Sequence, residues 1–154
     1  MARLELDGLD ETIEAMKQMG ELTGQTVNAM LMAGAAWIAQ GLERSARREG
    51  HKQSGDMILS IGYNASPKYV DDIPTIQVYA RGRDREGVSN MDKAFVNNYG
   101  TTKLDDTHWW EEGEAEAEPK AAAAMVEVWD EFVITGRVPQ VSGPGKYSVK
   151  RRTS

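Results

Sequence analysis

The chain has no cysteine and only two histidines among its 154 residues. Without cysteine it can form no disulfide, no thiolate metal site and no cysteine nucleophile, and its synthesis fits a reducing compartment. The histidines, His51 and His108, lie in different segments with no partner at ligand spacing. We interpret both as solvated or packing residues and expect neither a metal site nor a cofactor.

Long apolar runs are also missing. No segment approaches the roughly 20 consecutive apolar residues that span a bilayer. Residues 1–5 lack the charged-then-apolar pattern of a signal peptide. These absences predict a soluble, cytosolic product with no membrane partner.

Catalytic motifs are absent as well: the sequence has no G-x-S-x-G, no P-loop and no dinucleotide-binding motif. Its acidic pairs, Asp71–Asp72, Asp105–Asp106 and Glu111–Glu112, are sequence neighbours. Neighbouring side chains point apart and rarely converge on one substrate atom. We therefore predict that the protein is not an enzyme. A small nucleic-acid-acting enzyme with a carboxylate cluster is the distant alternative.

The overall charge is acidic, with a formal net charge of −6 and a pI of about 5.0. This disfavours a dedicated nucleic-acid binder, although an acidic surface can line a channel through which DNA slides without sticking. Two basic stretches, residues 44–52 and the loop 81–90, are diluted by acidic residues. They can contact DNA or an acidic neighbouring subunit, and both alternatives stay open.

The composition indicates one globular domain, because hydrophobic residues make up 40% of the chain and charged residues 27%. We predict a single domain over residues 1–136 and a flexible tail over residues 137–154. The tail is rich in glycine, proline and serine, and its basic residues are Lys146, Lys150, Arg151 and Arg152.

The strongest helical pattern covers residues 22–48, after a predicted short strand at 3–7 and a helix at about 11–18. Its apolar stripe, at spacings of three and four, consists of Val27, Met30, Leu31, Gly34, Trp37, Ile38, Gly41 and Leu42. Glycine is unfavourable inside a helix, so Gly34 and Gly41 predict the close approach of another backbone.

Alternating apolar residues predict strands over residues 57–64 and 76–81, paired antiparallel and joined by a connector at 65–74. Residues 81–90 are interpreted as a flexible, highly charged loop, and residues 93–99 as a short helix or strand.

The last predicted helix starts at Pro119, which suits a first helical turn, and ends at Gly136. Its predicted apolar stripe is Met125, Val126, Trp129, Phe132 and Val133. Before it lies an acidic stretch that starts with Trp109 and Trp110. Consecutive residues rarely both enter a core, so one of the two is expected at a subunit interface, with simple core packing as the equal alternative.

Taken together, the elements predict an α+β fold, with a long central helix and a C-terminal helix packed on a small antiparallel sheet. The candidate interface residues are the loop arginines, the tryptophan pair and the basic tail: Arg81, Arg83, Arg85, Trp109, Trp110, Lys146, Lys150, Arg151 and Arg152.

Four segments in this order resemble the HK97-type tail-component family of tailed bacteriophages. They are residues 4–11 (LELDGLDE), 32–36 (MAGAA), 53–61 (QSGDMILSI) and 93–101 (KAFVNNYGT). The chain departs from the family pattern where Asn98 replaces a common glutamate and where two tryptophans replace a proline–phenylalanine pair.

The resemblance implies assembly rather than catalysis. It implies a virion protein made in the bacterial host cytoplasm, repeated as a ring of roughly six or twelve copies in the head–tail connector or tail-completion region. Its expected neighbours are a connector, adaptor or head-closure protein and a tail terminator or tail-tube protein, with DNA passing non-specifically through the lumen. The alternative is a transient assembly factor or chaperone that is not retained in the virion.

Overall fold

The computed structural model describes residues 2–4, 21–49, 55–64, 67–101, 106–141 and 143. The helix predicted at 11–18, His51 and the four basic tail residues lie outside these ranges. The helices are α2 (Glu21–Arg48), α3 (Asp56–Ser60), α4 (Asn90–Tyr99) and α5 (Trp109–Thr135). The strands are β1 (Ala2–Leu4), β2 (Ile61–Tyr63), β3 (Lys68–Val70) and β4 (Ile73–Ala80). The predicted α+β class is confirmed.

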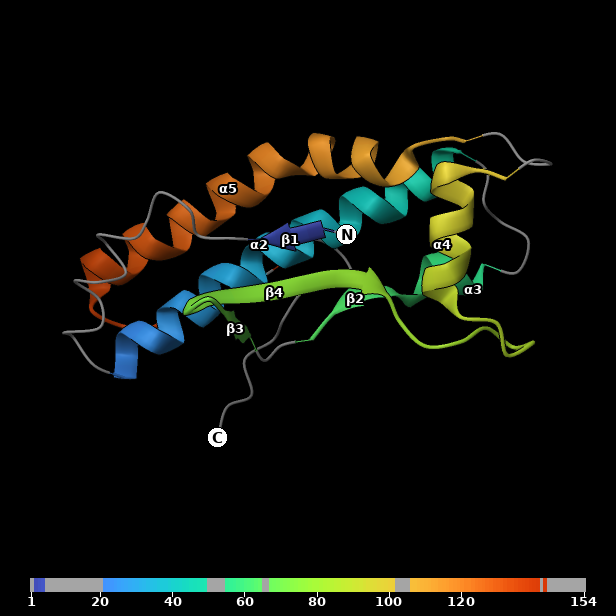
Figure 1. Cartoon of the computed structure of the whole chain (residues 1–154). Helices are drawn as coiled ribbons and strands as arrows, with labels where there is room; N and C mark the ends of the chain where they lie inside the picture. The colour runs from blue at the N-terminus through green and yellow to red at the C-terminus, as the bar shows by residue number, and fades with distance from the viewer. Residues whose placement is uncertain are drawn as a thin grey trace.

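Helix α2 is the centre of the molecule. It packs against α5 on one side and against β4, β2 and β1 on the other, while α3 and α4 lie together at one end (Figure 1). Because it is covered from two sides, α2 buries more than one stripe: Leu31, Ala35 and Leu42 are all fully buried. The helix predicted at 22–48 is confirmed almost to the residue.

The predicted close backbone approach is found at Gly41, where α2 crosses α5. A Cβ atom at Gly41 would lie 2.7 Å from the carbonyl oxygen of Gly113 and 2.6 Å from Cβ of Ala117. A Cβ atom at Gly113 would in turn lie 2.9 Å from the Gly41 carbonyl oxygen. Nearby, buried Ser45 donates a hydrogen bond of 2.6 Å to the carbonyl oxygen of Trp109. The two helices therefore meet backbone to backbone.

The sheet has the order β1-β4-β2, with every pair antiparallel, and β3 pairs with the start of β4. Ile76, Val78 and Ala80 of β4 are buried, whereas Gln77 between them is exposed. This alternation places one face of the sheet on the core. The antiparallel pairing predicted for the two strands is thus confirmed, although β4 starts three residues earlier than expected.

The segment predicted as a connector, residues 65–74, instead contains strand β3, a tight turn and the start of β4, which form a β-hairpin. Val70 pairs with Ile73, so Asp71 and Asp72 form a two-residue turn. Both aspartates have positive φ, 51° and 64°, as a type I′ hairpin turn requires. The pattern was missed because this turn most often carries glycine, and aspartate adopts the conformation less readily.

The strand predicted over residues 57–64 is wrong in its first half. Residues 56–60 form helix α3, and only Ile61–Tyr63 is a strand. Met57 and Ile58 are adjacent and both buried, which a strand with one buried face does not allow. The helix was hidden by the coincidental alternation of apolar residues.

The predicted start of the last helix is also wrong. Helix α5 begins at Trp109, ten residues before Pro119, and Pro119 lies inside it. Proline removes one helical hydrogen bond and bends a helix, and α5 arches over α2 in Figure 1. The predicted end is confirmed, because Gly136 caps the helix in the left-handed conformation.

The apolar stripe predicted for this helix is correct only in part. Met125 and Phe132 are buried and Trp129 is half-buried, but Val126 and Val133 are exposed. The buried face is completed by small residues four positions apart and one valine, namely Gly113, Ala117, Ala121 and Val128.

The predicted boundary between domain and tail lies too early. Val141 is buried in the core cluster and Val138 packs against it, although both belong to the segment predicted as a flexible tail from residue 137. The core therefore continues past Gly136.

Candidate functional site

The predicted acidic pairs lie in separate places, although Asp106 and Glu111 both approach His108, Glu111 at 3.7 Å from its Nδ1. Asp71 and Asp72 are at the hairpin tip, whereas Asp106 is at the start of α5, 2.8 Å from Nε2 of exposed His108. Among the described residues, no group of three or more histidine and carboxylate side chains could hold a metal ion. In the same part of the chain, no helix is long and apolar enough to cross a membrane.

The conformation of the charged loop, residues 81–89, is held by bonds of its own residue Asp84. Asp84 accepts hydrogen bonds from the backbone N–H groups of Glu86 and Val88, both at 2.9 Å, and forms an ion pair with Lys93 of α4. The pair with Lys93 and these N–H donors lower the pKa of the Asp84 carboxyl. The loop was predicted to be flexible, but these bonds give it a defined conformation.

The three arginines of this loop make contacts within the chain. The Arg85 side chain donates two hydrogen bonds to the carboxylate of Asp56 in α3, from Nη2 at 2.8 Å and from Nε at 3.0 Å. These bonds lower the pKa of the Asp56 carboxyl well below its usual range. Arg83 donates to the Gly87 carbonyl oxygen at 2.8 Å. The guanidinium of Arg81 lies over Gly62 of β2. All three stay exposed, so they still offer charge to a neighbour.

Both tryptophans are buried, as the core-packing alternative predicted. Trp109 is 0% and Trp110 5% exposed, and their rings meet at 5.2 Å. The Trp110 indole N–H donates to Glu114 at 2.8 Å. Burial raises the pKa of the Glu114 carboxyl above its ordinary value, against the effect of this hydrogen bond.

Asn98 of α4 organises the start of α5. Its side-chain oxygen accepts from the backbone N–H of Trp110 at 2.8 Å, and its amide donates to Glu111 at 3.0 Å. Its carbonyl oxygen accepts from the N–H groups of Thr107 and His108, at 3.2 and 3.0 Å. Asn98 is buried, so these bonds replace the N-terminal cap that α5 lacks on its own.

This junction opens into the α4 groove, an apolar groove of about 310 Å³. Phe95, 60% exposed, and Tyr99 stand beside it with ring centroids 4.7 Å apart. A hydrogen bond to Glu111 raises the pKa of the Tyr99 hydroxyl. The groove is lined by Met91, Asp92, Ala94, Phe95, Asn98, Tyr99 and Trp110.

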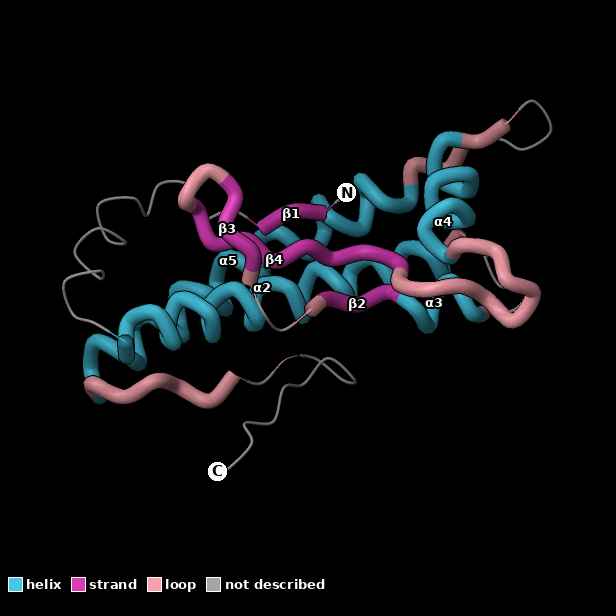
Figure 2. Tube along the Cα trace, turned by 60° about the horizontal axis from the view of Figure 1, so that its bottom comes forward, coloured by secondary structure: helices cyan, strands magenta, loops and turns pink. Residues whose placement is uncertain are grey.

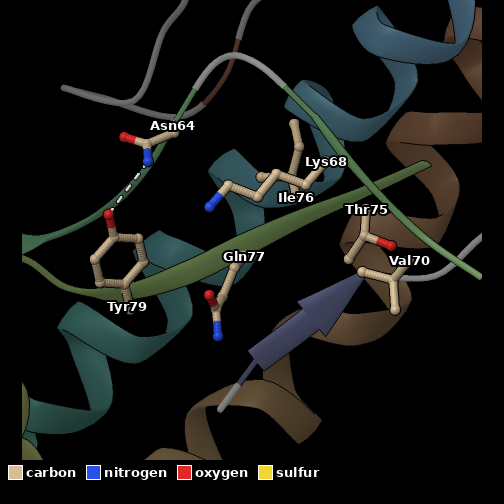
Figure 3. Close-up of a pocket in the computed structure, with 7 residues that line it drawn as sticks. All are labelled: Asn64, Lys68, Val70, Thr75, Ile76, Gln77 and Tyr79. Atoms are coloured by element: carbon tan, nitrogen blue, oxygen red, sulfur yellow. Dashed lines mark hydrogen bonds between the residues drawn. The ribbon is translucent and has the colours of Figure 1, made fainter. Parts of the chain in front are cut away.

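A second hollow, the strand pocket of about 260 Å³, lies beside β4, between the residues that pair with β2 and those that pair with β3. Four residues, 64–67, separate the pairs Tyr63–Val78 and Lys68–Thr75, whereas β4 has only residues 76 and 77 between them. Figure 3 shows Asn64 at one end of this gap, where its amide donates a hydrogen bond of 3.2 Å to the Tyr79 hydroxyl. The lining residues are Asn64, Lys68, Val70, Thr75, Ile76, Gln77 and Tyr79, none of them acidic, so the pocket offers no acid–base pair.

The hairpin beside this pocket exposes β3 completely. Tyr69 is 74% exposed, and Lys68 and Val70 are exposed as well. Sequence analysis missed both this strand and the α4 groove. The available signals were an aromatic and β-branched pair before Asp71, and the aromatic pair Phe95 and Tyr99 four residues apart.

Comparisons of the chain with protein-family models, with curated proteins and with solved structures give no match. The likeness to phage tail components therefore rests on the four sequence segments alone.

Proposed function

We propose that the chain is a non-enzymatic structural subunit of a tailed-phage particle, repeated as a closed ring of roughly six or twelve copies. The ring belongs to the neck or tail-completion region, between a connector or head-closure protein and a tail terminator or tail-tube protein. Two things support this: the four segments that resemble phage tail components, and exposed surfaces that suit protein contacts better than chemistry.

The observation that carries the proposal is the outer edge of β3, which pairs with no other strand in the described part of the chain. The two-residue turn makes Val70–Ile73 the closing hydrogen-bonded pair, so Tyr69–Pro74 is a non-hydrogen-bonded pair. Proline is tolerated there because it has no N–H to donate. The N–H and C=O groups of Tyr69 consequently point away from β4, where a strand from another copy can bind them.

The order of the strands favours a head-to-tail arrangement. β1 and β2 lie on opposite sides of β4, and the hairpin strand β3 extends the molecule beyond them. A subunit that pairs one edge with the other edge of its neighbour makes heterologous contacts, and such contacts close into rings when the rotation permits. The net charge of −6 suits a lumen through which DNA passes without binding.

The edge can be blocked without disturbing the fold. Tyr69→Pro removes the outward N–H but no hydrogen bond to β4, so the variant should stay folded and assemble less than the wild type. Tyr69→Thr keeps the N–H and is the matched control. Native mass spectrometry should show rings for the wild type and Tyr69→Thr and mainly monomers for Tyr69→Pro; equal assembly by all three would rule out this edge.

The particle itself separates the proposal from the alternative of a transient assembly factor. Counting the chain against the portal protein by mass spectrometry of purified particles should give roughly six or twelve copies. Its absence from infectious particles would replace the structural role with that of a departing factor.

A further inference from the structure

We propose that the α4 groove binds the basic C-terminal segment, residues 144–154, of a second copy of the chain. The inference rests on the proposed assembly of copies, and it names the segment that links one copy to the next.

The groove has the apolar character of a docking site for a peptide. Phe95 and Tyr99 hold their rings against each other in solvent, and Val96 beside them is exposed too. Trp110 forms part of the lining and is fixed by its bonds to Asn98 and Glu114. Rigid aromatic side chains around a hollow are typical of the energetically dominant part of an interface.

The surroundings of the groove are negatively charged. Asp92 lines it, Glu111 and Glu114 are bonded to lining residues, and Asp106 lies one turn before α5. Lys93, the nearby cation on α4, is paired with the carboxylate of Asp84. The groove therefore favours a partner that is both basic and partly apolar.

Residues 144–154 (PGKYSVKRRTS) have that chemistry. The segment carries four basic residues and no acidic one, and Tyr147 and Val149 stand between the charges. Tyrosine and valine can enter the apolar hollow while the basic side chains meet the carboxylates around it.

The described part of the chain favours a neighbour's groove over its own. The residues that follow α5 start at the end of the molecule remote from α4 and run only part of the way back (Figure 2). Because α5 rises about 38 Å from Trp110 to Thr135, a chain that filled its own groove would need part of residues 144–154 to reach it. The groove of a neighbouring copy carries no such requirement.

The absence of native cysteines allows a direct test with two single-cysteine, full-length chains. Val96→Cys is next to the groove without lining it, and Ser148→Cys lies between Tyr147 and Val149. After oxidation of a mixture, we expect the mixed dimer in roughly tenfold excess over the control pair of Ser148→Cys with Val133→Cys, because docking raises the local concentration. Val133 lies at the far end of α5 and is more exposed than Val96, 62% against 39%, so low accessibility cannot explain a weaker cross-link there.

Two changes should reduce the cross-link to the control level. One is Phe95→Ser with Tyr99→Ser in the groove chain, where both residues are exposed, so circular dichroism should remain unchanged. The other is high salt, since the screening length falls from about 30 Å at 0.01 M to about 3 Å at 1 M.

The remaining outcomes overturn the proposal in distinguishable ways. Rings without a preferential cross-link would exclude the groove and leave the ring intact. Neither rings nor a cross-link would remove both proposals. A chain carrying both cysteines that closes the bond within itself at nanomolar dilution would show that the occupant is its own segment.

Discussion

The α2–α5 crossing uses its side chains differently from the β3 hairpin and the α4 groove. At the crossing, Gly41, Gly113 and Ala117 have almost no side chains, so the two backbones come into contact. At the hairpin and the groove, Tyr69 and Phe95 hold large rings in solvent. Large exposed apolar side chains that gather in one place often mark a contact surface. The difference shows a core that packs within one copy, and the exposed rings motivate our proposal that partners cover the outer surface.

The largest effect should follow from adding one carbon at the crossing. Gly41→Ala should lower the free energy of unfolding by about 3 kcal/mol, because neither backbone can give way to a Cβ at 2.7 Å. Gly24→Ala, in the exposed first turns of the same helix, has no atom within 4 Å of its new Cβ. It should stabilise the protein by up to about 1 kcal/mol. Urea denaturation that ranked the two variants equally would contradict a backbone contact.

Truncations from the C-terminal side test how far the core extends along the chain. Removing everything after Gly136 deletes Val138 and Val141 from the core and should cost roughly 2–3 kcal/mol. Removing only the residues after Gly143 should leave the melting temperature unchanged. If the shorter truncation destabilises the fold equally, the basic segment belongs to the core and is not available to a partner.

The junction between the two regions depends on Asn98. Asn98→Ala should cost roughly 1–2 kcal/mol, because it leaves the buried Trp110 N–H without its acceptor. The adjacent, half-buried Asn97 provides the control, and Asn97→Ala should have a smaller effect on thermal unfolding. Equal effects would mean that the cap is not what holds α4 to α5.

The smallest effect concerns pH. The pKa values of Asp56 and Asp84 are lowered in the folded state by Arg85 and Lys93, respectively. Their stabilising contribution is therefore complete above the ordinary carboxyl pKa of about 4 and is lost as the pH falls through the lower folded values. Lys93→Met should reduce the melting temperature at pH 7 but much less at pH 2. The effect of Gly41→Ala should be the same at pH 7 and at pH 2, because it depends on packing and not on charge.

The sequence predicted those elements whose apolar residues recur at a regular spacing. The long helix, strand β4 and the close approach at Gly41 follow from local spacing. The first ten residues of α5 were missed because Pro119 suits a first helical turn, so the acidic stretch before it was placed outside the helix. Their signal was the spacing of four that links Gly113, Ala117 and Ala121.

The groove could not be predicted in the same way. It exists because Asn98 places α4 beside Trp110, twelve residues further along the chain. A side-chain amide that caps another helix has no periodic signature. Two other helices bury the tryptophans. Trp109 is fully enclosed near Ser45 of α2, and Trp110 faces α4.

The turn at Asp71 and Asp72 bears on how copies find one another. An uncovered strand edge is a hazard, because any extended chain can add to it and start a fibril. Here the edge is only three residues long and ends in two adjacent negative charges, which repel an identical edge. Pairing through β3 alone is therefore too weak to persist. Copies should join only where several contacts form at once, so that growth stops when the ring closes.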